Sequence, residues 1–163
     1  MVREIKIIKK SVFNDHRGRL WTSWKQSDYK NLKFNQDKIS ISKKNTLRGF
    51  HCDFKSWKLI TSAYGKFLLV AVNMNKNSKN YLKHNSFIVD HMKPKTVLIP
   101  PHYANAHLCL SKFCIFHYKW SYKGKYIDAK KQLSIRWNDP KINVKWPIKK
   151  PILSKRDSKS NFL

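Results

Sequence analysis

From Phe34 onward the sequence is a succession of short segments typical of β-strands, and this succession limits the folds available to the chain. The segments are rich in β-branched and aromatic residues, and turn-forming residues separate one from the next. The expected strands cover residues 38–42, 59–64, 66–73, 86–89, 96–99, 107–110, 113–120 and 133–137. Many short strands at this spacing predict an all-β protein, an antiparallel sandwich or barrel with a jelly roll as the preferred form.

Shorter elements are expected at both ends of the chain. Residues 5–8 are β-like, and residues 12–21 contain turn-forming residues between two short strands. The polar stretch 26–35 can hold a peripheral helical turn capped by Ser27. The tail 146–163 contains Pro147 and Pro151, so we expect it to be extended and to pack back on the body. No linker divides the chain, and residues 1–163 are interpreted as a single domain.

Composition favours a globular protein over a disordered or membrane-spanning one. The chain is 41% hydrophobic and 13% aromatic, which is too apolar for disorder. No apolar run approaches the roughly 20 residues of a membrane span, and the first residues lack the apolar segment of a signal peptide. The cysteines, Cys52, Cys109 and Cys114, lack CxxC spacing, which favours reduced packing residues. We therefore expect a cytoplasmic protein that does not bind a membrane.

Positive charge is the strongest compositional signal. The chain has 35 Lys and Arg against 9 Asp and Glu, a formal net charge of +26. Such a field attracts polyanions, including nucleic acids and nucleotides. The lysines are scattered through every segment, so a solvated surface without a binding role is an equally serious interpretation. A nucleic-acid-binding β-barrel remains an alternative function, although no RNP-like or helix-turn-helix pattern is present.

One stretch brings chemically useful side chains together between β-like segments: Arg48, His51, Asp53 and Lys58. A histidine displayed between strands can act as an acid or a base near neutral pH. The alternative for any single one of these residues is a solvated polar loop. Glu4 is the only Glu, so a catalytic carboxylate must come from a short set of Asp residues.

Metal and phosphate-loop chemistry find little support in the sequence. A metal site in a small β-barrel needs a close His pair and a carboxylate, and the chain has no HxH motif and no Glu after Glu4. The spacing of His102 and His107 fits no common ligand pattern. The four glycines are too dispersed for a phosphate-binding loop. We expect no bound metal and no cofactor.

A series of short motifs, in order along most of the chain, is similar to the dTDP-4-dehydrorhamnose 3,5-epimerase family. The motifs are DHRG at 15–18, FNQDK at 34–38, LRGFH at 47–51, KLI at 58–60, YG at 64–65, IPP at 99–101, YK at 118–119, WNDP at 137–140, WP at 146–147 and LSKRD at 153–157. The resemblance implies a metal-free cupin jelly roll, usually a homodimer. It also implies an enzyme of surface-polysaccharide biosynthesis that inverts C3, C5 or both carbons of a nucleotide-diphosphate-linked 4-keto sugar. A 3,4-ketoisomerase of the same fold is the alternative.

The resemblance also implies four catalytic roles. His51 resembles the base that removes a proton beside the ketone, and Asp157 resembles the carboxylate that orients it. Lys58 matches the amine expected near the developing enolate oxygen. Tyr118 matches the phenol that returns a proton from the opposite face. Competing proton donors are Tyr122, Tyr126 and His107.

The resemblance also implies substrate-binding residues, and several of these positions differ from the family's usual residues. Arg17 and Arg48 resemble diphosphate ligands, and Gln36 matches a sugar-contacting position. Lys38, Asp53, Thr22 and Asn105 stand where the rhamnose enzymes usually have Asn, Gln, Glu and a second His. With His107, the residues Lys38, Asp53 and Asn105 are also expected to contact the substrate. These departures, with a Tyr-x-Gly-x-Tyr motif at 122–126, favour a GDP-linked 4-keto heptose or 4-keto-6-deoxy sugar over the rhamnose precursor.

Overall fold

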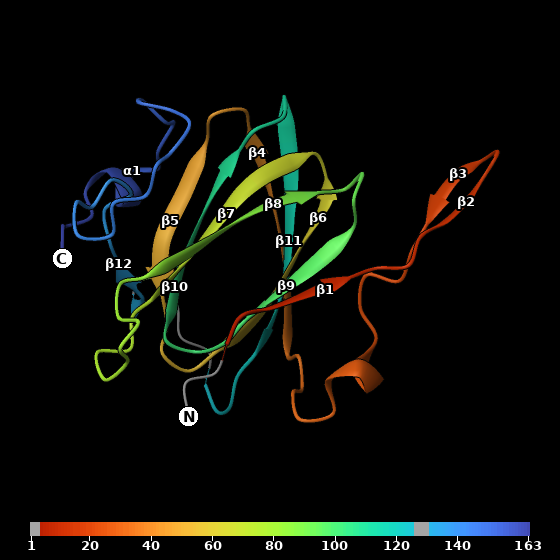
Figure 1. The fold of residues 1–163 in the computed structure, drawn as a ribbon, viewed down its shortest axis with the longest axis horizontal. Coiled ribbons are helices and arrows are strands. Elements are labelled where there is room, and N and C mark those ends of the chain that lie inside the picture. The colour runs from red at the N-terminus through yellow and green to blue at the C-terminus, as the bar shows by residue number, and fades with distance from the viewer. Residues whose placement is uncertain (1–3, 126–130) are drawn as a thin grey trace.

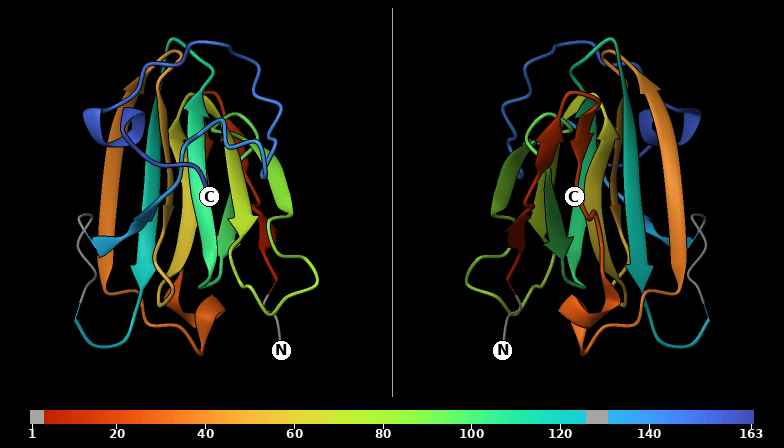
Figure 2. Two further views of the ribbon diagram at one scale, coloured as in Figure 1. Left: turned by 90° about the vertical axis from the view of Figure 1, so that its left-hand side faces the viewer. Right: turned by 90° about the vertical axis from the view of Figure 1, so that its right-hand side faces the viewer.

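The computed structural model describes residues 4–125 and 131–163, and the body of the molecule is formed by two five-stranded antiparallel sheets packed as a sandwich (Figure 1, Figure 2). Sheet I has the strand order β1-β9-β6-β11-β4, and sheet II has the order β12-β5-β10-β7-β8. The strands of sheet I are β1 (Lys6–Lys9), β4 (Gln36–Lys43), β6 (Trp57–Tyr64), β9 (Lys95–Ile99) and β11 (Phe113–Ser121). Those of sheet II are β5 (Leu47–Cys52), β7 (Lys66–Asn73), β8 (His84–Asp90), β10 (Tyr103–Cys109) and β12 (Leu133–Ser134). The predicted all-β jelly-roll architecture is confirmed.

Small elements lie outside the two sheets. β2 (Phe13–Asp15) and β3 (Gly18–Leu20) form a hairpin that projects from the body of the molecule (Figure 1), and a 3-10 turn, η1 (Gln26–Tyr29), follows it. The prediction that Ser27 caps this turn is wrong, because Ser27 lies inside η1 and the N-cap position is Lys25, without a side-chain hydrogen bond. In α1 (Lys155–Ser158), the Ser154 hydroxyl caps the helix by accepting a hydrogen bond from the Asp157 N–H at 3.1 Å.

The segment around His51 departs from the expected loop. It forms strand β5, with Leu47, Phe50 and Cys52 fully buried. Strand β10 begins at Tyr103, earlier than expected, and this extension places Asn105 opposite His51 in the ladder. His51 is therefore held in a paired strand, whose backbone is more rigid than that of an exposed loop.

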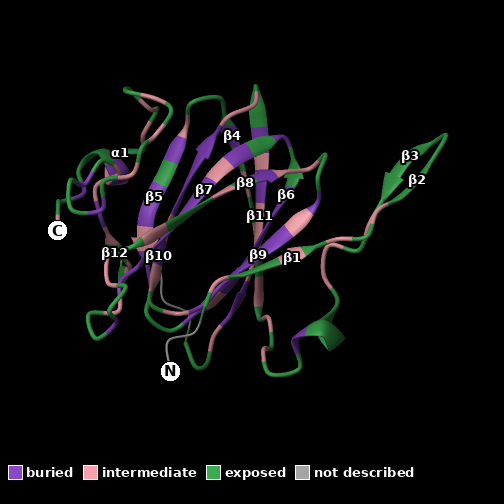
Figure 3. Ribbon diagram, viewed as in Figure 1, coloured by how far each residue is buried: buried purple, intermediate pink, exposed green. Residues whose placement is uncertain are grey.

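Strand β7 is buried almost throughout because both faces of sheet II are covered (Figure 3). Phe67, Leu69 and Ala71 pack in the cluster between the sheets, and Val70 and Val72 pack in the cluster on the other face. The C-terminal part of the chain covers that other face with Ile135, Trp137, Ile142, Val144, Trp146, Ile148, Leu153 and Leu163. A strand covered on both faces reads as a continuous apolar run, which is how residues 67–72 appear in the sequence.

The tail is also tied to β5 through its backbone. The Leu47 N–H donates to the Ile152 carbonyl at 3.0 Å, and the Ile152 N–H donates to the Asn45 carbonyl at 2.8 Å. The Trp146 ring lies 5.9 Å from the Phe50 ring, centroid to centroid. These contacts bring the end of the chain back to β5.

Gly49 allows β5 to approach β10 closely. Its φ is +112°, and a Cβ atom there would lie 2.5 Å from the Asn105 carbonyl oxygen and 2.8 Å from the Ala106 Cα. Both neighbours are backbone atoms, so neither can move aside without disturbing the ladder. Only glycine fits this position without strain.

We expect Gly49→Ala to lower the free energy of unfolding by about 3 kcal/mol, because it combines an unfavourable φ with a backbone clash. Gly124→Ala is the matched control: its φ is +72°, and nothing lies within 4 Å of an added Cβ. That variant should lose only about 1 kcal/mol. Urea denaturation of both variants measures the difference, and equal losses would contradict the close-approach argument.

Candidate active site

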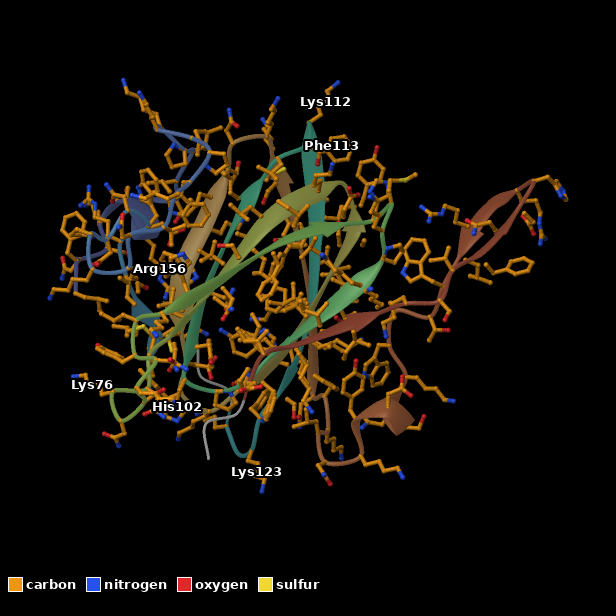
Figure 4. The ribbon with its side chains drawn as sticks, in the orientation of Figure 1. Lys76, His102, Lys112, Phe113, Lys123 and Arg156 are labelled. Atoms are coloured by element: carbon orange, nitrogen blue, oxygen red, sulfur yellow. The ribbon has the colours of Figure 1, made fainter. Side chains whose placement is uncertain are left out.

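A cavity of about 280 Å³ lies between the two sheets. It is lined by Ser40, Arg48, His51, Lys58, Ile60, Asn105, His107, Phe116, Tyr118, Trp120, Gln132, Ser154, Arg156 and Asp157. A larger hollow of about 670 Å³ is lined by other residues, including Lys76 and His102, and contains none of the predicted catalytic residues. Figure 4 places Lys76 and His102 in a different part of the molecule from Arg156. The smaller cavity is therefore the candidate active site.

His51 and Asp157 form a hydrogen-bonded pair in this cavity. His51 Nε2 lies 2.7 Å from Asp157 Oδ1, and the Gly49 N–H donates to Asp157 Oδ2 at 3.5 Å. The carboxylate is only 3% exposed. Burial alone would raise the pKa of Asp157, but His51, Ser154 and the Gly49 N–H together hold that pKa below its ordinary value. Asp157 is therefore ionised near neutral pH and orients the imidazole.

Lys58 is a buried lysine on the opposite sheet. Its ammonium group donates to Asn105 Oδ1 at 2.8 Å and lies 5.1 Å from the centroid of the Trp120 ring. Burial lowers the pKa of Lys58, and the nearby Asp53 carboxylate acts against that change. Lys58 occupies one lone pair of Oδ1, and the Asn105 amide also has N–H groups that can donate to a ligand.

Tyr118 lies on the wall that faces His51. It belongs to β11 of sheet I, whereas His51 belongs to β5 of sheet II, and both line the cavity. Its ring packs edge-on against Phe116 at 5.1 Å and against Trp120 at 5.9 Å. The base and the acid expected from the sequence thus lie on opposite walls of one cavity.

His107 differs from His51 in its surroundings. Its side chain stacks on Phe116, with ring centroids 4.1 Å apart, and its Nε2 is buried without a hydrogen-bond partner. Burial, with the nearby charges of Arg48 and His51, lowers the pKa of His107 to about 3. The imidazole is therefore neutral at physiological pH, which disfavours His107 as a competing proton donor.

The predicted binding residues are only partly brought together. Arg48 lines the cavity, and its Nε donates to Ser42 Oγ at 3.0 Å. Lys38 lies next to the cavity, because its Nζ is 5.4 Å from the ring centroid of Trp120, which lines the cavity. Gln36 is outside the lining, although its side-chain oxygen is buried without a hydrogen-bond partner.

Asp53 and Arg17 are not placed to contact a ligand in this cavity. The Asp53 side chain has no exposed area and lies beside Lys58, with Oδ2 3.8 Å from Nζ. Arg17 is at the turn of the projecting hairpin, 77% exposed, and pairs with Asp15 at 2.7 Å. Their predicted direct contact with substrate is therefore not supported within one chain. Asp53 is buried behind Lys58, and Arg17 lies on the projecting hairpin, outside the cavity lining.

Other residues of the cavity were absent from the sequence-based set. Arg156 lines it, and its guanidinium donates to Ser134 Oγ at 2.7 Å and 2.9 Å. Its position beside Asp157 in the LSKRD motif was an available signal. Trp120 and Gln132 had no comparable signal, since strand pairing decides their direction. Of the remaining candidate donors, Tyr122 is outside the lining, and Tyr126 lies outside the described residues.

Within residues 4–125 and 131–163, no group of three or more His, Cys, Asp or Glu side chains is arranged to hold a metal ion. The same part of the chain contains no helix long and apolar enough to cross a membrane.

Comparisons with known proteins identify the family of the chain. The family model described as dTDP-4-dehydrorhamnose 3,5-epimerase matches residues 1–163. The chain belongs to this epimerase family. A dTDP-4-dehydrorhamnose 3,5-epimerase from Salmonella typhimurium is 30% identical over 171 residues, which cover 99% of this chain and 92% of the relative.

Solved structures of such epimerases share the fold. The Legionella pneumophila enzyme, in complex with dTDP-4-keto-L-rhamnose, aligns with a TM-score of 0.90 at 26% identity, over 97% of this chain and 87% of that one. The Bacillus anthracis enzyme, with TDP and pyrophosphate bound, aligns with a TM-score of 0.89 at 26% identity, over 98% and 94% of the two chains. The predicted family and the predicted class, an epimerase of nucleotide-linked 4-keto sugars, are confirmed.

We expect His107 to make stability depend on pH. Its pKa is about 3 in the folded state, and an unfolded histidine titrates near 6.5. The unfolded chain binds more protons between these values, so stability is lost as pH falls from 6.5 toward 3. Relative to His107→Phe, the parent should lose about 2 to 3 kcal/mol between pH 7 and pH 4.5. Urea denaturation across this range tests it, and parallel pH curves would contradict it.

Proposed function

We propose that this epimerase inverts C3, C5 or both carbons of a nucleotide-diphosphate-linked 4-keto sugar, with His51 as the base. The observation that carries the proposal is the His51–Asp157 pair at 2.7 Å in a cavity whose far wall holds Lys58 and Tyr118. Hydrogens beside a ketone are weakly acidic, and a base removes one when the resulting enolate is stabilised. The four groups supply the base, its orientation, the stabilising charge and the returning acid.

Proton removal is assigned to one nitrogen of His51. Nε2 faces the Asp157 carboxylate, so the tautomer with Nε2–H leaves the Nδ1 lone pair for the substrate proton. When Nδ1 is protonated, the imidazolium is stabilised by the adjacent buried carboxylate. Asp157 thus supports the charged form that the reaction transiently creates.

The enolate oxygen is assigned to Lys58 and Asn105. As the proton leaves, negative charge develops on the former ketone oxygen. A fixed ammonium group in a cavity that excludes much of the water stabilises that charge more than solvent would. The free N–H of the Asn105 amide provides a second donor to the same oxygen.

The proton returns from Tyr118 on the opposite wall. Delivery to the face away from His51 inverts the carbon, and the enolate collapses back to the ketone. Arg48 and Arg156, both lining the cavity, are assigned to the diphosphate, because a guanidinium forms paired hydrogen bonds with phosphate oxygens.

We propose a 4-keto sugar other than the rhamnose precursor as the preferred substrate, with GDP as the nucleotide. Asn105 supports this choice, since it lines the cavity and differs from the His usual in rhamnose enzymes. NMR of GDP- and dTDP-linked 4-keto sugars in deuterated water is the test. Label incorporation identifies the substrate and the carbon together. A carbonyl that moves to C3, without inversion, would instead identify a ketoisomerase.

We expect the base and the acid to fail differently when removed. His51→Asn should abolish deuterium uptake at every carbon, a loss of at least about 100-fold, because proton removal stops. Tyr118→Phe should still exchange the proton with deuterium but return it with retained configuration. The ratio of exchange to inversion, measured by NMR, separates the two roles.

Tyr122→Phe is the matched control, since Tyr122 lies outside the cavity lining and should keep the parent ratio. If Tyr122→Phe loses inversion while Tyr118→Phe does not, the acid is assigned to the wrong tyrosine. Substantial exchange in His51→Asn would remove His51 from the role of base.

We also propose that the working unit is a homodimer, in which the β2–β3 hairpin of each subunit reaches the cavity of its partner. Arg17 on this hairpin would then act as a diphosphate ligand in trans. Ile39 and Ile41 of β4 support the proposal, being 67% and 64% exposed on the outer face of sheet I, since monomers rarely leave such patches uncovered. The Trp24 ring packs on Phe34 of its own chain, so the isoleucines are stronger interface candidates than this tryptophan.

We expect two inactive variants to regain activity when their subunits are combined in one dimer. Arg17→Ala and His51→Asn each damage a different part of the shared site. In a mixed dimer, one site receives an intact His51 from one subunit and an intact Arg17 from the other. After the two variants are refolded together, the activity of each mixed dimer should approach that of one intact site.

Light scattering of Ile41→Asp checks the interface itself, and this variant should be monomeric. Ile88→Asp, which alters an isoleucine 45% exposed on β8 of sheet II, is the control and should remain dimeric. An active parent monomer at assay concentration, or mixed dimers without recovered activity, would refute the proposal.

A further inference from the structure

Asp53 is a buried carboxylate that the reaction proposed above does not use. It follows β5 directly, and Oδ1 accepts hydrogen bonds from the Ser56 N–H at 2.7 Å and the Lys55 N–H at 3.2 Å. These bonds fix one carboxylate oxygen in a tight turn. The other oxygen, Oδ2, is buried without a hydrogen-bond partner, and Lys58 Nζ lies 3.8 Å from it.

We propose that Asp53 is a positioning residue for the epimerase reaction: from behind Lys58 it keeps the ammonium group charged and directed at the cavity, an inference that rests on the function proposed above. Asp53 does not touch the substrate, because its side chain has no exposed area and is absent from the cavity lining. It acts through Lys58 alone.

The geometry of Lys58 gives Asp53 this role. Lys58 bridges the two sheets, because it belongs to β6 of sheet I and donates to Asn105 on β10 of sheet II. The Trp120 ring lies beside the ammonium group. Asn105 and the ring offer partial negative charge only, so Asp53 supplies the full negative charge that an ammonium group deprived of water requires.

The other groups facing Lys58 do not replace Asp53. The thiol of Cys52 on β5 has a pKa raised to about 12 by burial, so it carries no charge. Lys38 on β4 shares the Trp120 ring, 5.4 Å from its centroid, and its positive charge disfavours a second cation.

Charged groups across the cavity belong to the other wall. Asp157 is engaged by His51 at 2.7 Å, and the guanidinium groups of Arg48 and Arg156, which also line the cavity, repel an ammonium group. His107 is neutral at physiological pH, because burial lowers its pKa to about 3. Asp53 is therefore the carboxylate that compensates the positive charge of Lys58. Asp53 beside Lys58 then parallels Asp157 beside His51, because each buried carboxylate supports one basic side chain of the cavity.

The competing interpretation is that Asp53 only holds the turn. Asp53→Asn separates the two, because the amide oxygen still accepts the Lys55 and Ser56 N–H groups while the negative charge is lost. If charge is what matters, the Lys58 pKa must fall in this variant, since removing an adjacent anion favours the neutral amine.

The direct test is NMR titration of Lys58 in protein labelled at lysine Cε, with the signal assigned from Lys58→Arg. We expect Asp53→Asn to lower the Lys58 pKa by about one unit or more. In the enzyme assay, the fall of kcat at high pH should begin about one pH unit lower in Asp53→Asn than in the parent. At a fixed pH on this limb, kcat should therefore be roughly tenfold lower. KM should change by less than about twofold, because ground-state binding does not involve Asp53.

Asp90→Asn is a matched control. Asp90 also accepts a turn N–H, from Met92 at 2.9 Å, and pairs with a lysine, Lys66, at 3.3 Å, but it lies outside the cavity lining. This variant should leave the Lys58 titration and the pH profile unchanged.

A second variant keeps the test decisive if Asp53→Asn fails to fold. Asp53→Ser keeps a side-chain acceptor for the turn N–H groups and also lacks the negative charge, so it should lower the Lys58 pKa in the same direction. An unchanged Lys58 titration in folded Asp53→Asn or in folded Asp53→Ser would overturn the inference. Both titrations need no substrate, so their outcome is distinguishable from failure of the epimerase proposal, which would appear as absent deuterium exchange in the parent.

Discussion

The fold and the site both depend on the return of the C-terminal tail to strand β5. Ile152 pairs through its backbone with Asn45 and Leu47, and the apolar side chains of the tail cover the outer face of sheet II. The single turn of α1 follows at once and buries Asp157 beside Gly49 and His51. A buried carboxylate is tolerated when hydrogen bonds and an opposite charge compensate it. The contacts that complete the core therefore also orient the His51 imidazole.

Acidic residues are scarce in this chain, yet several of them are buried. Asp53, Asp139 and Asp157 are 3%, 1% and 3% exposed, although a net charge of +26 would favour acids on the surface. Each accepts backbone N–H groups, and Asp139 holds the end of the chain by accepting from the Leu163 N–H at 2.7 Å. These hydrogen bonds compensate each carboxylate for the loss of water. Asp53 and Asp157 lie beside Lys58 and His51 of the cavity, and Asp139 fixes the end of the tail that contains Asp157.

The sandwich divides the chemistry between its two sheets. His51, Asn105 and His107 come from sheet II, while Lys58 and Tyr118 come from sheet I. In the proposed mechanism, a planar enolate held between these walls has the proposed base on one face and the proposed acid on the other, which is the arrangement that inversion requires. Aromatic side chains around Lys58 and Tyr118 limit water, and a lower local dielectric strengthens the interaction of the ammonium group with developing negative charge. The narrow space between packed sheets thus serves both stability and the reaction.

The sequence by itself determined the all-β class, the family and the identity of His51, Lys58, Tyr118 and Asp157 as candidates, because strand periodicity, turn residues and motif order are local properties of a chain. It did not show that the segment around His51 is a paired strand, that Asp53 is hidden behind Lys58, or that His107 is buried and neutral. Those properties depend on which distant segments meet: 106 positions separate His51 from Asp157. Burial and charge environment arise only when the sheets and the tail pack. They decide the protonation state of each side chain and whether it can contact a ligand in the cavity.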